Sequence, residues 1–298
     1  MISIVIPAYN RAAALQSCIE SIMQQAYAGL EVIVIDDGSS DGTVELLQQL
    51  KKKYVGITVI INPGNFGVNY SRNRGIERAS GKFILFLDSD DRLAPGALEA
   101  IRNATAAHAS TEHFLFLVSD RKEEFAHMKE ATYFKYANWL QGTIGGDFIH
   151  MVAAGVMKKY LFFEQFRMYE YLNWLRVFKA TTPQLLVPFI VAERERGRAD
   201  SLTTASRLKN FSVIKGKFES QQLYYTLYHK DLQYFQSKAL TRKLLGAIML
   251  GVACNRKKEC HRLVQYGSRL SIKLAGSLIL LFPPALMRSL IIVWSSLK

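Results

Sequence analysis

The sequence predicts an α/β protein with a Rossmann-like, mainly parallel sheet flanked by helices, followed by a mostly helical C-terminal region. Three observations predict this class. Short runs of apolar, often β-branched residues alternate with segments of helical spacing over the first third of the chain. Polar turn clusters follow directly after several of these runs. Beyond Ser206 the strand signals stop, and basic segments with helical spacing take over.

The expected strands are short, apolar and bounded by turn residues. They are residues 3–6, 31–35, 57–61, 83–87, 114–118 and 185–192. The expected helices show apolar residues three and four apart. They are residues 15–25, 44–53, 69–79 and 95–107, and the aromatic segment 162–178 is expected to be helical toward its end. This alternating order favours parallel strands that are covered by helices on both faces.

Polar residues follow three of the expected strands at the point where each strand ends. They are Ala8-Tyr9-Asn10, Asp36-Asp37 and Asp88-Ser89-Asp90-Asp91. Ligands of open α/β sheets bind outside the carboxyl ends of the strands, so these clusters are expected to meet in one crevice. Two carboxylates at Asp88 and Asp90 repel each other unless a cation neutralises them. Their hard oxygen ligands favour Mg²⁺ or Mn²⁺, which can also bind a diphosphate.

These clusters belong to four segments that carry a family resemblance. The segments are residues 3–11 (SIVIPAYNR), 32–43 (VIVIDDGSSDGT), 71–76 (SRNRGI) and 83–91 (FILFLDSDD). In this order and spacing they resemble family 2 of the inverting glycosyltransferases, which have the GT-A fold. The resemblance covers the first hundred residues well and the next hundred loosely.

The resemblance implies a donor site for a nucleotide sugar. Pro7, Ala8 and Tyr9 would line the base, and Asp37 would accept a hydrogen bond from uracil, which favours a UDP-sugar. Asp90 would ligate the metal, and Asp88 would contact the metal or the ribose. The implied donor-binding set is Pro7, Ala8, Tyr9, Asn10, Asp37, Arg72, Asp88, Ser89 and Arg196. For Asp36-Asp37 the alternative is a turn that caps a helix.

The catalytic base is expected to be Glu170. Inverting transfer needs a carboxylate that takes the proton of the acceptor hydroxyl. Counting back from Trp174 and Arg176 puts Glu170 where the family usually has Asp. This is a departure from the family pattern, although glutamate is also ionised at neutral pH. Asp147 and Glu164 are the reserve candidates, and a surface carboxylate on an amphipathic helix is the alternative for Glu170.

A basic segment follows the last expected strand. It contains Arg194, Arg196 and Arg198, and the family has a similar segment that can close over the donor phosphates. Bidentate arginine suits a diphosphate. A solvated turn is an equally good interpretation of any one of these arginines.

The net charge of +13 resides entirely in the C-terminal third. Residues 1–204 contain 22 basic and 22 acidic side chains, whereas residues 205–298 contain 16 basic and 3 acidic ones. This asymmetry indicates an anionic partner such as lipid headgroups, and a solvated basic face is the alternative. We therefore expect a catalytic domain at 1–204, with a nucleotide-binding half at 1–110 and an acceptor half at 111–204, and a basic helical region at 205–298.

The segment 274–294 is apolar but is interrupted by Pro283-Pro284 and Arg288. A membrane-spanning helix needs about 20 apolar residues, so an interfacial or re-entrant hairpin fits better. A core or oligomer-interface helix pair is the alternative. The chain shows no recognisable signal peptide, and Cys18, Cys254 and Cys260 form no disulfide framework. We expect a cytoplasmic protein on the inner face of the cell membrane, with Cys254 and Cys260 unligated.

Taken together, these features favour a glycosyltransferase of the hexosyl or N-acetylhexosaminyl type. Its acceptor would be a glycan or a lipid-linked sugar in surface polysaccharide synthesis, and it could form a homo-oligomer through its C-terminal region. A nucleic-acid-binding protein is an alternative that would use the basic tail with Tyr224, Tyr225, Tyr228 and Tyr234. A dinucleotide-dependent oxidoreductase would need Gly-x-Gly-x-x-Gly after the first strand, where this chain has Pro-Ala-Tyr-Asn-Arg.

Overall fold

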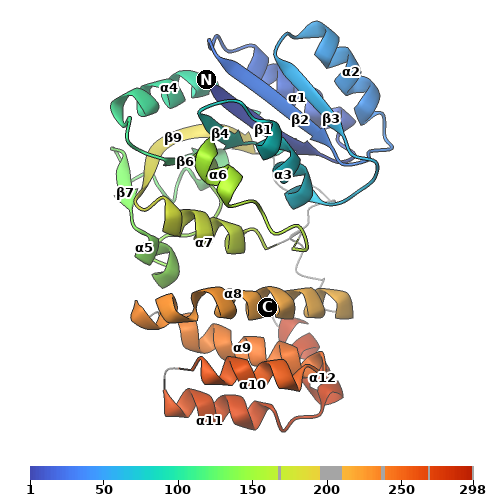
Figure 1. Ribbon diagram of the computed structural model, residues 1–298, viewed down its shortest axis with the longest axis vertical. Helices are drawn as coiled ribbons and strands as arrows, with labels where there is room; N and C mark the ends of the chain where they lie inside the picture. Colours follow the sequence, from blue (N-terminus) through green and yellow to red (C-terminus); the bar gives the residue numbers. More distant parts are fainter. Residues whose placement is uncertain (167–168, 195–209, 236–238, 268, 297–298) are drawn as a thin grey trace. The chain divides into compact units, whose positions relative to one another are not determined.

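The computed structural model describes residues 1–298 except 167–168, 195–209, 236–238, 268 and 297–298 (Figure 1). The chain divides into two compact units. Unit 1 comprises Met1–Tyr136 and Gly146–Arg198, and unit 2 comprises Ala137–Gly145 and Ala199–Lys298. The expected domain boundary at residue 204 lies outside the described residues, and the subdivision at residue 110 stays an expectation.

Unit 1 is built on one mixed sheet. Its described strands are β1 (Ile2–Ala8), β2 (Leu30–Asp36), β3 (Ile57–Ile61), β4 (Phe83–Phe86), β5 (Asp91–Leu93), β6 (His113–Val118), β7 (Thr132–Phe134), β8 (Ile149–Ala153) and β9 (Gln184–Arg194). The strands lie side by side in the order β3-β2-β1-β4-β8-β6-β9-β5, and β7 pairs with the N-terminal end of β9. The predicted α/β class with a helix-flanked sheet is confirmed, and the sheet is mixed, because the described strands make four parallel and four antiparallel pairings.

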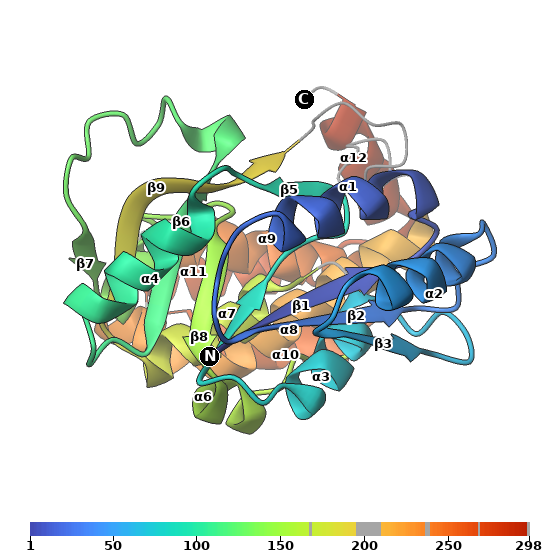
Figure 2. The ribbon, with the colours of Figure 1, turned by 90° about the horizontal axis from the view of Figure 1, so that it is seen from above.

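The parallel half of the sheet forms as the sequence predicts. β3, β2, β1 and β4 run parallel and side by side (Figure 2). Every residue of β1 and β4 is buried, which explains their continuous apolar sequences. Their carboxyl ends reach the same edge of the sheet, where Ala8 pairs with Asp36 and β4 leads into Asp88. This edge carries the candidate site.

Helices cover both faces of the sheet (Figure 1). The helices of unit 1 are α1 (Ala12–Met23), α2 (Thr43–Lys53), α3 (Val68–Arg78), α4 (Ala97–Ala107), α6 (Ala154–Lys159) and α7 (Tyr171–Ala180). Apolar residues of α1, α2 and α4 pack on one face with Ile4 and Val34. On the opposite face α3 approaches so closely that a Cβ on Gly75 would lie 2.4 Å from Cγ1 of Val5. Glycine at this position lets α3 lie directly on the sheet.

The second half of the sheet is antiparallel at its centre. β8 pairs antiparallel with both β4 and β6, and β9 pairs parallel with β6 and antiparallel with β5. The sequence indicates β6 and β9, but β5, β7 and β8 were not predicted. β7 and β8 are short strands, and the apolar sequence of β8 is interrupted by His150, which is buried.

Unit 2 is helical. Its C-terminal helices are α8 (Phe211–Tyr234), α9 (Ala239–Ala253), α10 (Lys257–Gln265), α11 (Leu270–Ile279) and α12 (Pro284–Ser296), and α5 (Tyr136–Gln141) lies earlier in the chain. α9 packs against all four of the others. No single helix among the described residues is long and apolar enough to cross a membrane. α11 and α12 together have the required length and composition, but they are bent by 108° relative to each other.

Candidate functional site

The turns after β1 and β2 are bonded to each other. The backbone N–H of Asn10 donates to Oγ of Ser39 (2.8 Å), and the backbone N–H of Ser40 donates to Oδ1 of Asn10 (2.9 Å). Asn10 has a φ of 52°, a left-handed conformation that asparagine tolerates better than most residues. Tyr9 therefore follows a fixed turn and is exposed at the sheet edge, while Ala8 is buried.

The carboxylate of Asp37 holds the segment between β3 and α3. Oδ1 accepts from Nδ2 of Asn62 (2.9 Å) and from the backbone N–H of Phe66 (3.1 Å), and Oδ2 accepts from the backbone N–H of Gly67 (2.6 Å). A carboxylate oxygen has two lone pairs, so Oδ2 has room for one further donor besides Gly67. Asp36 serves as a turn residue, because its Oδ2 accepts from the N–H groups of Gly38 and Ser39.

Three carboxylates follow β4 within four residues. Asp88 and Asp90 are partly exposed, whereas Ser89 and Asp91 are buried. Burial, together with the negative charges of Asp88 and Asp90, raises the pKa of Asp91 to about 7. Burial is the larger cause, and the neighbouring carboxylates add to it because like charges disfavour ionisation.

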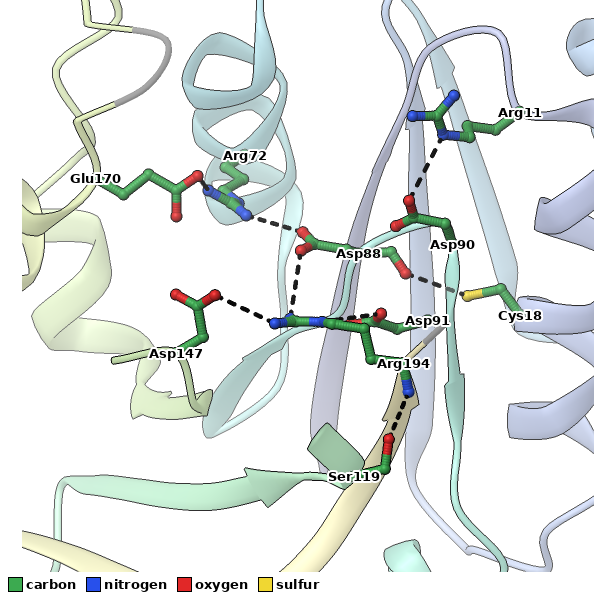
Figure 3. Close-up of polar contacts among 10 residues, drawn as sticks. All are labelled: Arg11, Cys18, Arg72, Asp88, Asp90, Asp91, Ser119, Asp147, Glu170 and Arg194. Atoms are coloured by element: carbon green, nitrogen blue, oxygen red, sulfur yellow. Dashed lines mark hydrogen bonds and ion pairs between the residues drawn. The ribbon is translucent and has the colours of Figure 1, made fainter. Parts of the chain in front are cut away.

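Arg194, the last residue of β9, enters this acidic cluster (Figure 3). Its Nη2 lies 3.2 Å from Oδ2 of Asp91 and 3.9 Å from Oδ2 of Asp88, and its Nη1 lies 3.2 Å from Oδ2 of Asp147. Its backbone N–H donates to Oγ of Ser119 (3.0 Å). Burial disfavours the charged guanidinium, but the hydrogen bond and charge of Asp91 outweigh it and raise the pKa of Arg194. Of the predicted basic segment, Arg194 thus reaches the site, while Arg196 and Arg198 lie outside the described residues.

Arg72 joins Asp88 to Glu170 (Figure 3). Nη2 of Arg72 donates to Oδ1 of Asp88 (3.0 Å), and Nη1 forms an ion pair with Oε1 of Glu170 at 2.6 Å. The guanidinium is buried on α3 and lies over the ring of Phe162. Burial alone would lower the pKa of Arg72, but the charges of Glu170 and Asp88 raise it. One buried cation therefore connects the acidic cluster with the predicted base.

The three base candidates have different surroundings. Glu170 immediately precedes α7 and shares Arg72 with Asp88. Glu164 accepts from Nδ2 of Asn73 (2.9 Å), so its carboxylate is engaged with α3. Asp147 is largely exposed and pairs with Arg194. Glu170 and Asp147 are both accessible to solvent, and each is linked to the acidic cluster through an arginine, Glu170 through Arg72 and Asp147 through Arg194.

The segment before Glu170 is held by side chains of α3 that bond to its backbone. Nδ2 of Asn69 donates to the carbonyl oxygens of Phe163 (2.9 Å) and Phe166 (2.6 Å). Asn73 accepts from the backbone N–H of Phe162 (2.8 Å) and donates to its carbonyl oxygen (3.0 Å). The helix that carries Arg72 therefore also positions the chain that leads to Glu170.

Behind the site, α7 packs on a buried histidine pair. The ring of Trp174 stacks on His150 with centroids 3.7 Å apart, and Nε2 of His113 lies 3.0 Å from Nδ1 of His150. Nδ1 of His113 lies 3.1 Å from Oγ1 of Thr181, and that hydroxyl donates to the carbonyl oxygen of Val177. Thr181 must therefore accept from His113, and His113 in turn accepts from His150. Burial lowers the pKa of His113 to about 3, so both imidazoles are neutral at pH 7.

The chemistry of Asp88 and Asp90 fits a hard divalent cation. Both carboxylates are partly exposed, Asp88 pairs with Arg72, and Nε of Arg11 lies 4.0 Å from Oδ2 of Asp90. Among the described residues, no group of three or more His, Cys, Asp or Glu side chains is arranged to hold a metal by itself. This matches Mg²⁺-type sites, where one or two carboxylates bind the ion and substrate phosphates and water supply the other ligands.

Comparison with known proteins identifies relatives of this chain. The family model described as glycosyl transferase family 2 matches residues 3–161. The GalNAc(5)-diNAcBac-PP-undecaprenol beta-1,3-glucosyltransferase of Campylobacter jejuni is 28% identical over 224 residues, which are 73% of this chain and 72% of the relative. The putative teichuronic acid biosynthesis glycosyltransferase TuaG of Bacillus subtilis is 36% identical over 99 residues, 33% of this chain and 39% of the relative.

Solved structures share the fold. Staphylococcus aureus TarS 1-349 in complex with UDP-GlcNAc matches with a TM-score of 0.62 at 14% identity, over 99% of this chain and 88% of the other. The mannosyltransferase PcManGT of Pyrobaculum calidifontis, in complex with GDP-Man and Mn²⁺, matches with a TM-score of 0.59 at 13% identity, over 100% and 86% of the two chains. At these identities the likeness shows the GT-A fold alone.

Proposed function

Since this chain belongs to glycosyltransferase family 2, we propose that it transfers a hexosyl or N-acetylhexosaminyl group from a UDP-sugar to a hydroxyl of a glycan or lipid-linked acceptor, with inversion of the anomeric configuration. The pathway would build a cell-surface polysaccharide. One observation carries the proposal: Arg72 binds Asp88 through one nitrogen and Glu170 through the other. Asp88, which is suited to bind the donor and its metal, and Glu170, which is suited to act as the base, are thus joined by the buried guanidinium of Arg72.

The donor would bind along the carboxyl ends of β1, β2 and β4. Pro7, Ala8, Tyr9 and Asn10 would line the nucleoside, and the remaining lone pair on Oδ2 of Asp37 would accept from the uracil N–H. Ser89 and Arg72 would orient the donor near the acidic cluster. The predicted contact of Arg196 with the phosphates remains part of this proposal, and Arg194 lies two residues earlier in the chain.

Asp88 and Asp90 would hold Mg²⁺ or Mn²⁺ together with the donor diphosphate. The ion, when bound, stabilises the negative charge on the departing diphosphate. Arg194 pairs with Asp91 and also lies near Asp88, so it holds the acidic cluster together beside the charge of the diphosphate.

Glu170 would act as the base. It removes the proton of the acceptor hydroxyl while that oxygen forms a bond to the anomeric carbon, and the bond from this carbon to the diphosphate oxygen breaks with its electron pair. Arg72 orients the carboxylate through the 2.6 Å ion pair. Because the attack comes from the side opposite the diphosphate, a single displacement inverts the configuration.

The acceptor would be reached at the inner face of the cell membrane, where lipid-linked sugars are assembled. The Campylobacter jejuni relative is named for a lipid-linked acceptor, and residues 205–298 carry 16 basic and 3 acidic side chains. The C-terminal region would also be the place for a homo-oligomer contact.

The alternatives have less support. Tyr224, Tyr225 and Tyr228 are buried in α8, so they cannot stack on nucleic-acid bases, and of the four tyrosines only Tyr234 is exposed. The turn after β1 lacks the glycines that a dinucleotide-binding loop requires.

The test uses the full chain with a panel of nucleotide sugars, with and without Mn²⁺. The right donor at a hundredfold excess over its Kd should stabilise the protein by about 2.7 kcal/mol, seen as a higher Tm. Asp90→Asn should abolish the metal-dependent part of this shift and lower turnover by roughly 10²–10³-fold, because charge stabilisation is lost. Glu45→Gln, an exposed carboxylate on α2, is the control and should change neither.

Two results would contradict the proposal. In one, no nucleotide sugar shifts the Tm or is cleaved at any metal concentration. In the other, NMR of the product shows that the anomeric configuration of the donor is retained, which would exclude a single displacement.

A further inference from the structure

α11 has an apolar side that the fold of unit 2 does not use. Leu270, Leu274 and Leu278 are four residues apart, lie on one side of the helix and are 58–73% exposed. The other side is buried: Ile272 is in the interior, and a Cβ on Gly276 would lie 3.0 Å from Cδ1 of Ile248. A helix at the surface of a soluble unit normally presents polar residues outward, so this outer leucine row has no role in the packing.

α12 repeats the same arrangement. Met287 and Ile291 are buried against the rest of unit 2, while Leu286, Leu290 and Val293 are 44–58% exposed. We call the exposed residues of both helices the leucine face, defined as Leu270, Leu274, Leu278, Leu286, Leu290 and Val293. Each helix thus exposes a row of apolar residues rather than scattered single ones, and such rows are typical of an interaction surface.

The connection between the helices adds to the leucine face and limits what can cover it. Leu281 and Phe282, which lie in the connection, are also exposed. α11 alone, with its ten residues, is too short to cross a membrane, and the bend of 108° keeps α11 and α12 from forming one straight span. A pair of short amphipathic helices instead suits a position along the boundary between headgroups and acyl chains.

The charge around the leucine face selects an anionic partner. Residues 260–298 contain five basic residues and no acidic residue. Arg262 and Arg269 are exposed beside the helices, and Lys273 is half-buried on α11. Arg288 has a structural role, because it donates to the carbonyl oxygen of Ala253 and lies over the ring of Phe211. Two copies of this chain that met through the leucine face would bring like charges together, which disfavours the leucine face itself as the homo-oligomer contact.

We infer that the leucine face inserts into one leaflet of an anionic lipid bilayer, with α11 and α12 lying along its surface and Arg262, Arg269 and Lys273 bound to lipid phosphates. This inference deepens the proposed function, because it rests on an acceptor that lies at a membrane and assigns the contact to particular helices. It requires no donor, metal or acceptor, so it is tested separately from catalysis.

The experiment is flotation of the full chain with vesicles of phosphatidylcholine alone or mixed with phosphatidylglycerol. The wild type should float with the anionic vesicles at low salt and less at high salt, since screening weakens the phosphate contacts. Leu274→Gln combined with Leu278→Gln should weaken binding at least about tenfold, because it removes inserted apolar area. Arg269→Gln should weaken binding to anionic vesicles and leave binding to neutral vesicles unchanged.

The control is Val55→Gln, which replaces an even more exposed apolar residue in unit 1 and should bind vesicles like the wild type. All variants are compared by Tm and by cleavage of a nucleotide sugar, which the leucine-face changes should leave unaltered. If the protein cleaves a nucleotide sugar but does not bind vesicles, only the membrane inference fails. If it binds vesicles but does not cleave the sugar, only the proposed function fails.

The depth of insertion provides an independent measurement. Leu278→Trp should fluoresce, and bromine atoms near the headgroup end of the acyl chains should quench it more than bromine at the bilayer centre. The inference is overturned if the wild type does not float with anionic vesicles at low salt, or if the double glutamine variant floats equally well. It is also overturned if sedimentation shows a dimer that the glutamine variant dissociates, since the leucine face would then bind a second copy.

Discussion

Arg72 is buried, and its charge is neutralised by carboxylates from two distant parts of the chain, Asp88 and Glu170. In the free protein the ion pair holds Glu170 toward the acidic cluster. An arginine suits this place better than a lysine, because its planar fork offers separate nitrogens to the two carboxylates. The orientation of the proposed base therefore depends on a residue that lies about a hundred positions earlier.

The proposed role of Glu170 leads to a first prediction at the residue scale. Glu170→Gln should lower kcat by roughly 10²–10⁴-fold and leave the KM for the donor nearly unchanged, because the amide cannot accept the proton. Steady-state kinetics with the identified donor measures both constants. Glu164→Gln is the matched control, since its remaining oxygen still accepts from Asn73 and activity should persist. A large loss of kcat in Glu164→Gln or Asp147→Asn, but not in Glu170→Gln, would transfer the role to that residue.

The buried histidine pair gives a second prediction. Both imidazoles are neutral in the folded protein with a lowered pKa, whereas they take up protons near pH 6.5 when unfolded. The stability they contribute is complete above this pH and is lost as the pH falls toward 3, by up to about 1.4 kcal/mol per pH unit for each histidine. His150→Phe should flatten the fall of the free energy of unfolding between pH 6.5 and pH 4.5, relative to the wild type.

Chemical unfolding at a series of pH values measures this slope. The ring of Phe can still stack on Trp174, so the comparison mainly concerns the titrating nitrogen. His127→Phe changes an exposed histidine of the same unit and should leave the slope as it is. Equal slopes in the wild type and His150→Phe would show that the pair does not govern acid stability.

At the scale of elements, α3 has the central position. It lies directly on the sheet through Gly75, carries Arg72, and bonds to the segment before Glu170 through Asn69 and Asn73. The distance of α3 from the sheet therefore sets the positions of Arg72 and of the segment that leads to Glu170. Glycine lowers the intrinsic stability of a helix, but here it permits the close approach.

This arrangement predicts that Gly75→Ala is destabilising. The added methyl group would lie 2.4 Å from Cγ1 of Val5, so the free energy of unfolding should fall by about 1–3 kcal/mol and activity should fall with it. Gly155→Ala on α6 is the control, because no heavy atom lies within 4 Å of its new Cβ and the change should be neutral or stabilising. Similar unfolding midpoints for the two variants would contradict the importance of this contact.

The parallel elements could be predicted from the sequence because each strand is a continuous apolar run that ends in a turn cluster. Residues 57–61 are predicted and observed with the same bounds. β8 could not be predicted, because its pairing with β4 and β6 is antiparallel and its buried His150 resembles a polar surface residue. Burial and then the neighbouring His113 lower the pKa of His150, and periodicity does not reveal a buried pair that joins two strands.

The candidate site, like the sheet, could be predicted from the sequence only in part. The convergence of the turns after β1, β2 and β4 follows from the topology, and the hydrogen bonds of Asn10 with Ser39 and Ser40 agree with it. The backbone bonds of Asp37 and the bridging geometry of Arg72 were not foreseen, because they depend on loop conformations. Of the predicted arginines, Arg72 and Arg194 lie among the carboxylates, while Arg196 lies outside the described residues.

At the scale of the whole molecule, charge and chemistry are divided between the two units. Unit 1 contains the acidic cluster and the family motifs, whereas the excess of positive charge lies in residues 205–298. In the proposed function, unit 1 supplies the chemistry and the basic region supplies the contact with an anionic membrane. The leucine face of α11 and α12 gives this division a structural basis.

The bonds from Asn69 and Asn73 have a consequence for protein engineering. Because these bonds to Phe162, Phe163 and Phe166 end on main-chain atoms, they do not depend on which side chains the segment carries. A chimaera could receive residues 161–166 from a relative with another acceptor and still fasten the transplanted loop to the same helix. Evolution would have the same freedom: this loop can diversify in composition while the carboxylate that follows it stays in register.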